Sequence, residues 1–133
     1  MGAVAQNAVE MILTKQWAGY LTVPVFVMDA GGNLLYYNEP AEPLIGRPFD
    51  DVGELPSTEL ASIFETSAED GSAIPNDELP IVVALMQRRP AHLRMRMRSL
   101  DGVERVLEVT AFPIEGQAGR FLGAVAMFWE APS

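Results

Sequence analysis

Histidine and cysteine, the residue types that most often bind transition metals or form nucleophilic catalytic pairs, are nearly absent from this chain. Among the 133 residues there is one histidine, His92, and there is no cysteine. A catalytic nucleophile needs a base within hydrogen-bond reach, so only serine, threonine and Lys15 remain as candidates. Adjacent carboxylates occur at 50–51 and 69–70, but both pairs fall in expected loops, where solvated acids are common. The sequence therefore predicts a protein that is not an enzyme.

One alternative remains open, a small α+β enzyme of the isomerase or dehydratase kind with a buried carboxylate. Asp29 follows a run of apolar residues and is the one acid that falls on an apparently buried element. A strongly raised carboxyl pKa inside a pocket would support this alternative. The Gly31-Gly32 pair that follows is interpreted as a hairpin turn, so we expect no phosphate-binding loop.

The charge of the chain is acidic and unevenly distributed. The formal net charge is −9 and the isoelectric point is near 4.4, which argues against nucleic-acid binding. Residues 1–87 carry two basic and thirteen acidic side chains, whereas residues 88–133 carry seven basic and five acidic ones. The basic cluster comprises Arg88, Arg89, Arg94, Arg96 and Arg98. We expect a solvated sheet face paired with glutamates, and a docking patch for an acidic partner is the alternative.

The sequence predicts neither secretion nor a membrane anchor. The first twenty residues contain one basic residue and lack the pattern of a signal peptide. The longest strongly apolar stretch, 121–129, has nine residues, too few to cross a bilayer. The absence of cysteine favours a cytoplasmic location, and the chain length favours a single domain.

The segment 92–110 predicts an antiparallel hairpin whose register follows from parity. Apolar and basic residues alternate from His92 to Arg98, and a second alternating run begins at Glu104, which is typical of strands with one buried face. A two-residue loop would place charged side chains opposite apolar ones. A three-residue loop closed by Gly102 in the left-handed conformation instead pairs Met95 with Leu107, Leu93 with Val109, Arg98 with Glu104 and Arg94 with Glu108.

The other segments predict short elements separated by turns. We expect strands over 25–28, 34–37 and 121–129, and helices over 4–21, 57–64 and 77–87. Asn38 is expected to cap a brief helix that ends at Gly46, and residues 49–56 are expected to form a loop. The buried side of the helix over 77–87 is predicted to contain Ile81, Val82, Leu85 and Met86.

Together these elements predict an α+β domain. The strands over 25–28 and 34–37 are too short to form a stable sheet alone, so we expect them to join the three longer strands in one five-stranded antiparallel sheet. The short helices would cover one face of this sheet, and the amphipathic helix at the N-terminus would be available for the other.

The order of these elements, with the residues at their boundaries, resembles the PAS domain family. The stretches that carry the resemblance are Val25 to Asp29 before a Gly-Asn turn, Leu35-Tyr36-Tyr37-Asn38 before a short helix, Asp77-Glu78-Leu79-Pro80 entering a longer helix, Asp101-Gly102 in the hairpin, and Gly123 to Met127 before Glu130. The resemblance covers about residues 23–130. A dimerisation helix over 1–22 would precede this domain, and a linker or tail over 131–133 would follow it.

The resemblance implies a non-catalytic sensory and protein-interaction module in signal transduction. Such a module regulates an output domain in the same chain or a separate signalling partner. Trp129 and Glu130 would form the exit through which a signal leaves the domain. Flavin-binding light sensors of this family use a cysteine, and haem-binding members usually use a histidine of the long helix; neither residue is present at these places. We therefore expect no haem, flavin or metal, although a Met86, Met95 or Met97 ligand to haem stays open.

Two interpretations of the interior remain. A small apolar ligand could lie between the inner face of the sheet and the helices, or the side chains could fill this space themselves, and methionine-rich walls suit both. The candidate pocket residues are Phe26, Met28, Tyr36, Ile63, Val82, Leu85, Met86, Met95, Leu107 and Val109.

Apolar residues on both faces of the last strand predict a homodimer, because large exposed apolar patches are rare on monomers. One face would pack on the short helices, and the N-terminal helix of the same copy or of a second copy would cover the other. The candidate interface residues are Val9, Ile12, Leu13, Trp17, Leu122, Ala124, Ala126 and Phe128.

Overall fold

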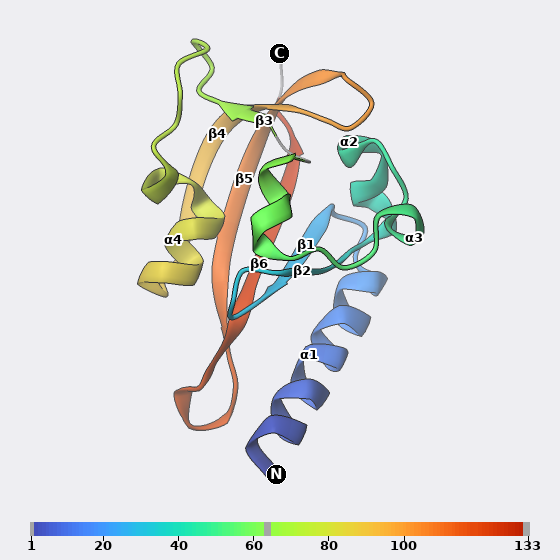
Figure 1. The fold of residues 1–133 in the computed structure, drawn as a ribbon, viewed down its shortest axis with the longest axis vertical. Coiled ribbons are helices and arrows are strands. Elements are labelled where there is room, and N and C mark those ends of the chain that lie inside the picture. Colours follow the sequence, from blue (N-terminus) through green and yellow to red (C-terminus); the bar gives the residue numbers. More distant parts are fainter. Residues whose placement is uncertain (1, 63–64, 132–133) are drawn as a thin grey trace.

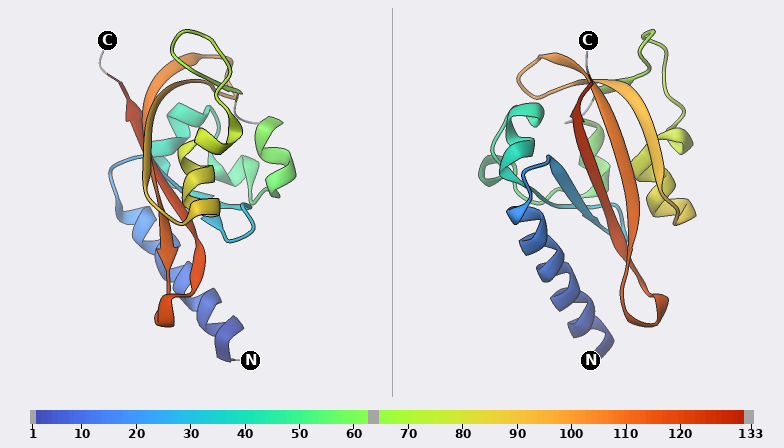
Figure 2. Two further views of the ribbon diagram at one scale, coloured as in Figure 1. Left: turned by 90° about the vertical axis from the view of Figure 1, so that its left-hand side faces the viewer. Right: turned by 180° about the vertical axis from the view of Figure 1, so that it is seen from behind.

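The computed structural model describes residues 2–62 and 65–131 of the chain. One curved antiparallel sheet forms its centre (Figure 1). Short helices cover the inner face of this sheet, and a single long helix lies against its outer face (Figure 2). The predicted α+β arrangement is therefore confirmed.

The sheet contains six strands in the order β2-β1-β6-β5-β4-β3. In chain order they are β1 (Val25–Asp29), β2 (Leu34–Tyr37), β3 (Glu65–Ser67), β4 (Ala91–Arg98), β5 (Glu104–Glu115) and β6 (Phe121–Glu130). The last strand, β6, pairs with both β1 and β5. This position joins the two halves of the chain in one sheet and leaves β2 and β3 at its edges.

The predicted register of the long hairpin is confirmed. The pairs Met95↔Leu107 and Arg94↔Glu108 both form between β4 and β5. The backbone N–H of Ser99 donates to the carbonyl oxygen of Val103 (3.0 Å), which leaves a loop of three residues. Gly102 closes this loop with φ +82°, in the left-handed conformation that the parity argument requires.

The prediction of five strands is wrong because it omitted β3. This strand has three residues and pairs with the edge of β4, with Glu65 opposite Arg98 and Ser67 opposite Arg96. Such a short polar segment has no apolar alternation that could identify it as a strand. Only the proximity of an unpaired edge of β4 makes it one.

The helices agree with the predictions in place but less well in extent. In chain order they are α1 (Gly2–Tyr20), η1 (Glu39–Ala41), α2 (Glu42–Ile45), α3 (Phe49–Val52), η2 (Ser57–Ser62), η3 (Asn76–Glu78), α4 (Pro80–Gln87) and η4 (Gln117–Gly119), where η denotes a 3-10 helix. The expected loop over 49–56 thus contains a helical turn. The helix expected over 77–87 is interrupted at Leu79, which is extended (φ −66°, ψ 131°) because a following proline disfavours helical geometry. None of the helices in the described ranges is long and apolar enough to cross a membrane.

Asn38 has a different role from the predicted helix cap. It stands at the N-terminal boundary of η1, but its side chain makes no capping hydrogen bond there. The side chain is buried; its oxygen accepts the N–H of Val25 (2.9 Å), and its nitrogen donates to the carbonyl oxygens of Ala18 (3.0 Å) and Val23 (2.8 Å). Asn38 therefore ties the end of α1 and the start of β1 to the end of β2.

Two apolar clusters stabilise the fold, one on each face of the sheet. The inner cluster contains Phe26, Leu34, Tyr37, Ala41, Ile45, Ala84, Met97, Leu107, Ala111, Ala124, Ala126 and Phe128. The outer cluster is smaller and consists of Ala18 of α1 with Val25, Val27 and Val125 of the sheet. Burial on two faces explains why β1 and β6 are apolar almost throughout.

Candidate functional site

Helix α1 is apolar on two sides, and only one of them contacts the sheet. Ala18 is fully buried and Met11 packs against the outer cluster. The predicted interface residues of α1 lie on the other side: Val9, Ile12, Leu13 and Trp17 keep exposed fractions of 54%, 53%, 57% and 45%. Four large apolar side chains in solvent on one helix are unusual for a monomer and indicate an interaction surface.

An open groove lies next to this exposed side of α1. It has a volume of about 430 Å³. Leu13 and Trp17 of α1 form one wall, and Phe112, Ile114 and Val125 of the sheet form the other. The exposed side of α1 and the groove together make one apolar surface, which we call the α1 surface.

The structure corrects the part of the predicted interface that lies on β6. Ala124, Ala126 and Phe128 belong to the inner cluster, where the ring centroid of Phe128 is 5.6 Å from that of Phe26. Leu122 is also buried, with 5% of its surface exposed. These four side chains pack against other residues of the same chain and are not available to a partner. On the opposite parity, Val125 faces the outer side of the sheet, where it is buried in the outer cluster with 1% of its surface exposed.

The predicted pocket residues divide between the two faces. Phe26 and Leu107 belong to the inner cluster, and Leu85 and Val109 pack against it. Met28 and Met95 are also buried. The structure thus brings together about half of the predicted set, on the face of the sheet that the helices cover.

Four predicted pocket residues remain, and two of them, Tyr36 and Met86, lie elsewhere. Tyr36 packs against the outer cluster, because residues of β2 alternate between faces and Tyr37 occupies the inner one. Met86 is 78% exposed, so the predicted buried side of α4 is wrong at this position. Val82 is only partly buried, and Ile63 lies outside the described residues.

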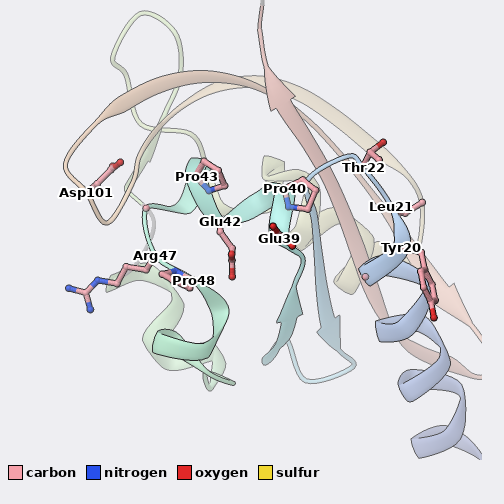
Figure 3. A pocket seen from close by; sticks show the side chains of 12 residues that line it. Tyr20, Leu21, Thr22, Glu39, Pro40, Glu42, Pro43, Arg47, Pro48 and Asp101 are labelled. Atoms are coloured by element: carbon pink, nitrogen blue, oxygen red, sulfur yellow. The ribbon is translucent and has the colours of Figure 1, made fainter.

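A second depression lies between the end of α1, the segment 39–48 and the β4–β5 turn (Figure 3). Its volume is about 860 Å³. Carboxylates and proline rings line it: Glu39, Glu42 and Asp101 with Pro40, Pro43 and Pro48. The sequence prediction missed this cleft, although the repeated Glu-Pro pairs at 39–40 and 42–43 were a local signal.

Tyr37 is connected to two residues that line this cleft, Arg47 and Glu42. Its hydroxyl donates to the carbonyl oxygen of Arg47 (2.8 Å). Burial, with the nearby carboxylates of Glu42 and Asp51, raises the pKa of Tyr37 to about 12. Each of these causes disfavours the phenolate.

The raised pKa of Tyr37 predicts a loss of stability at alkaline pH. An unfolded tyrosine has a pKa near 10, so the contribution of Tyr37 is complete below about pH 10 and is lost as the pH rises towards about 12. Urea unfolding between pH 9 and pH 12 measures this slope. Replacing Tyr37 with phenylalanine should make the slope shallower, and an unchanged slope would contradict the assignment.

The predicted signal exit is connected to the β4–β5 turn through Arg105. Its guanidinium lies 3.3 Å from a carboxylate oxygen of Glu130 and donates to the hydroxyl of Ser99 (2.9 Å). The Ser99 hydroxyl in turn donates to the carbonyl oxygen of Leu44, in α2. One side chain therefore links the end of β6 to the helices of the inner face.

Two arginines of the basic cluster, Arg94 and Arg98 of β4, pair with neighbouring glutamates. Arg94 lies 3.1 Å from Glu69 and 3.7 Å from Glu108. Arg98 pairs with Glu65 (3.8 Å) and Glu104 (3.9 Å). The expected glutamate-paired sheet face is confirmed for these two arginines.

Comparisons with known proteins identify the fold. No protein-family model and no curated protein matches the sequence. Among solved structures, the PAS domain of nitrogen regulation protein NR(II) from Vibrio parahaemolyticus matches with a TM-score of 0.64 and 20% identity, over 90% of this chain and 98% of that one. The PAS domain of Bordetella pertussis BvgS matches with a TM-score of 0.62 and 14% identity, over 93% and 87% of the two chains.

This chain has the PAS fold.

A Rhodobacter sphaeroides LOV protein shares the PAS fold with a TM-score of 0.70 and 12% identity, over 92% of this chain and 67% of that chain. The predicted resemblance is therefore confirmed for the fold. Of the three methionines left open as a haem ligand in this PAS fold, Met86 is exposed, whereas Met95 and Met97 are buried. His92 contacts Thr110 and Glu108 on the surface. In the part of the chain that the structure describes, no three His, Asp or Glu side chains group as metal ligands would.

Proposed function

We propose that this chain is a non-catalytic sensory and protein-interaction module that works as a homodimer and regulates an output domain or a partner protein. The observation that carries the proposal is the α1 surface. The structural neighbours support the signalling role, since they include the PAS domains of a nitrogen regulation protein and of the fruit-fly ELK potassium channel.

The proposed partner of the α1 surface is a second copy of this chain. The exposed side of α1 and the groove beside it belong to the same face, so two copies related by a two-fold axis can each place the helix over the groove of the other. Leu13 and Trp17, which are about half exposed in the single chain, would then be buried. This arrangement covers the apolar surface without a further protein.

The proposed route of the signal runs from the dimer to Glu130. A change in packing of the sheet would shift β6, and the ion pair of Glu130 with Arg105 (3.3 Å) would transmit the shift to the β4–β5 turn. Packed elements tend to move between discrete arrangements, so a small displacement can be amplified at the exit.

The proposal does not depend on a ligand in the interior. Phe26 lies with its ring centroid 5.7 Å from that of Tyr37 and 5.6 Å from that of Phe128. These rings occupy the middle of the inner cluster, which favours a packed core over a ligand pocket among the two interpretations.

Replacing Leu13 with glutamate tests the dimer. A charge at the centre of the α1 surface opposes its burial, so we expect the intact chain to sediment as a dimer at tens of micromolar and Leu13→Glu to sediment as a monomer. Met86→Glu is the control, because Met86 is also apolar and exposed (78%, against 57% for Leu13) but lies on α4; this variant should remain dimeric. A monomeric intact chain at that concentration, or a dimeric Leu13→Glu variant, would refute the proposal.

A further inference from the structure

The N-terminal half of α1 contacts the tip of the β5–β6 hairpin at one polar point. A carboxylate oxygen of Glu10 lies 3.2 Å from the guanidinium of Arg120. The two side chains are 110 positions apart in the chain and retain only 21% and 28% of their exposure. The hairpin extends towards the N-terminal end of the helix (Figure 2), and this ion pair joins the hairpin to α1.

The second carboxylate oxygen of Glu10 is enclosed against the hairpin backbone. It is buried and accepts no hydrogen bond from the described residues. A Cβ atom at Gly116 would lie 1.9 Å from this oxygen, so the carboxylate occupies the space that a side chain at 116 would take. A buried oxygen without a donor weakens the contact, which makes it easier to open than a fully satisfied ion pair.

We infer that Glu10, Arg120 and Gly116 form a latch that holds the N-terminal half of α1 against the β5–β6 hairpin. The other end of α1 is held separately, since Asn38 donates to the carbonyl oxygen of Ala18 (3.0 Å). An isolated helix of this length is only marginally stable in water. When the latch opens, the part of α1 around Glu10 leaves the hairpin while the last turn of the helix stays attached through Ala18.

The latch regulates the α1 surface, and this consequence rests on the proposed homodimer. Leu13 and Trp17, which line the groove, lie between Glu10 of the latch and Ala18, which Asn38 holds. Opening the latch changes the angle of α1 and therefore the shape of the surface that a second copy contacts. The contact between the latch and α1 lies within one chain and does not depend on the dimer. The latch and the homodimer can therefore be tested separately.

Hydrogen exchange of α1 amides tests the latch at concentrations where the protein sediments as a monomer. In Gly116→Ala and in Glu10→Gln, the amides at 9–14 should exchange about tenfold faster than in the unchanged chain. This factor lies between the effect of losing an exposed ion pair and that of losing a buried one. Amides at 15–20 should keep their exchange rates. Gln117→Ala, an exposed change in the same hairpin, is the control and should resemble the unchanged chain. Unchanged rates at 9–14 in both variants would overturn the latch.

A double variant separates the latch from a damaged hairpin. If alanine at 116 acts only by displacing the carboxylate, adding Gly116→Ala to Glu10→Ala should cause no further change in exchange at 9–14. A further increase would show that alanine distorts the hairpin itself and would overturn the assigned role of Gly116. Faster exchange at 9–14 in a chain that never dimerises would support the latch and refute only the homodimer.

Discussion

Replacing Gly123 with alanine should destabilise the protein by at least about 3 kcal/mol, among the largest effects that a single substitution produces. Gly123 lies in β6 with φ +155°, a conformation that residues with a side chain rarely adopt. A Cβ atom there would lie 2.0 Å from the carbonyl oxygen of Met28 and 3.0 Å from the backbone of Asp29. Both obstacles are backbone atoms of the paired strand β1, so no side chain can move aside.

Gly102→Ala is the matched control for Gly123→Ala. Gly102 also has a positive φ, +82°, but a Cβ atom at this position would meet no atom within 4 Å. Its cost should therefore be limited to the left-handed conformation, about 1–2 kcal/mol. Urea unfolding at 25 °C measures both variants. Equal losses in the two would contradict the claim that the close approach of β1 and β6 requires glycine at 123.

Replacing Asn38 with alanine should cost about 3 kcal/mol or more, the second large effect. The substitution removes three hydrogen bonds and leaves the buried N–H of Val25 and the partly buried carbonyl oxygen of Val23 without this partner. Each hydrogen bond contributes about 1 kcal/mol, and an unsatisfied buried group costs about 1–3 kcal/mol more. The effect should be accompanied by faster hydrogen exchange in the last turn of α1, because the Ala18 contact is lost.

Asn76→Ala is the control for Asn38→Ala. Asn76 begins η3 and is exposed, so its replacement should change the free energy of unfolding by no more than about 0.5 kcal/mol. Chemical unfolding of both variants under the same conditions provides the comparison. A loss below about 1 kcal/mol for Asn38→Ala would mean that the three hydrogen bonds do not anchor α1.

Local patterns in the sequence were sufficient to predict the register of the strands that have one buried face. The alternation on β4 and β5 and the need for like faces to meet selected one register, and Met95↔Leu107 and Arg98↔Glu104 pair as expected. Charge matching across the pair supported the same register. This inference succeeds because a shift of one residue would reverse the face of every side chain in the strand.

Patterns of this kind could not assign faces where both sides of an element are apolar. Alternation separates Ala124, Ala126 and Phe128 from Val125 and Met127, but only the packed structure shows that the first set meets Phe26 in the inner cluster. The same ambiguity affected α1. The predicted interface residues Val9, Ile12, Leu13 and Trp17 are exposed, and Ala18 makes the close contact with the sheet.

Tertiary contacts also decided the roles of single polar residues. Asn38 occupies a capping position by sequence, yet its side chain bonds to backbone groups up to 20 positions away. Glu10 and Arg120 are ordinary surface residues in the sequence and meet only because the β5–β6 hairpin reaches α1. Hydrogen bonds and ion pairs between distant segments leave no periodic trace, because they depend on where the chain returns and not on its local composition. The fold class and the hairpin register are therefore local properties of this sequence, whereas the α1 surface and its two anchors arise from the packing of distant segments.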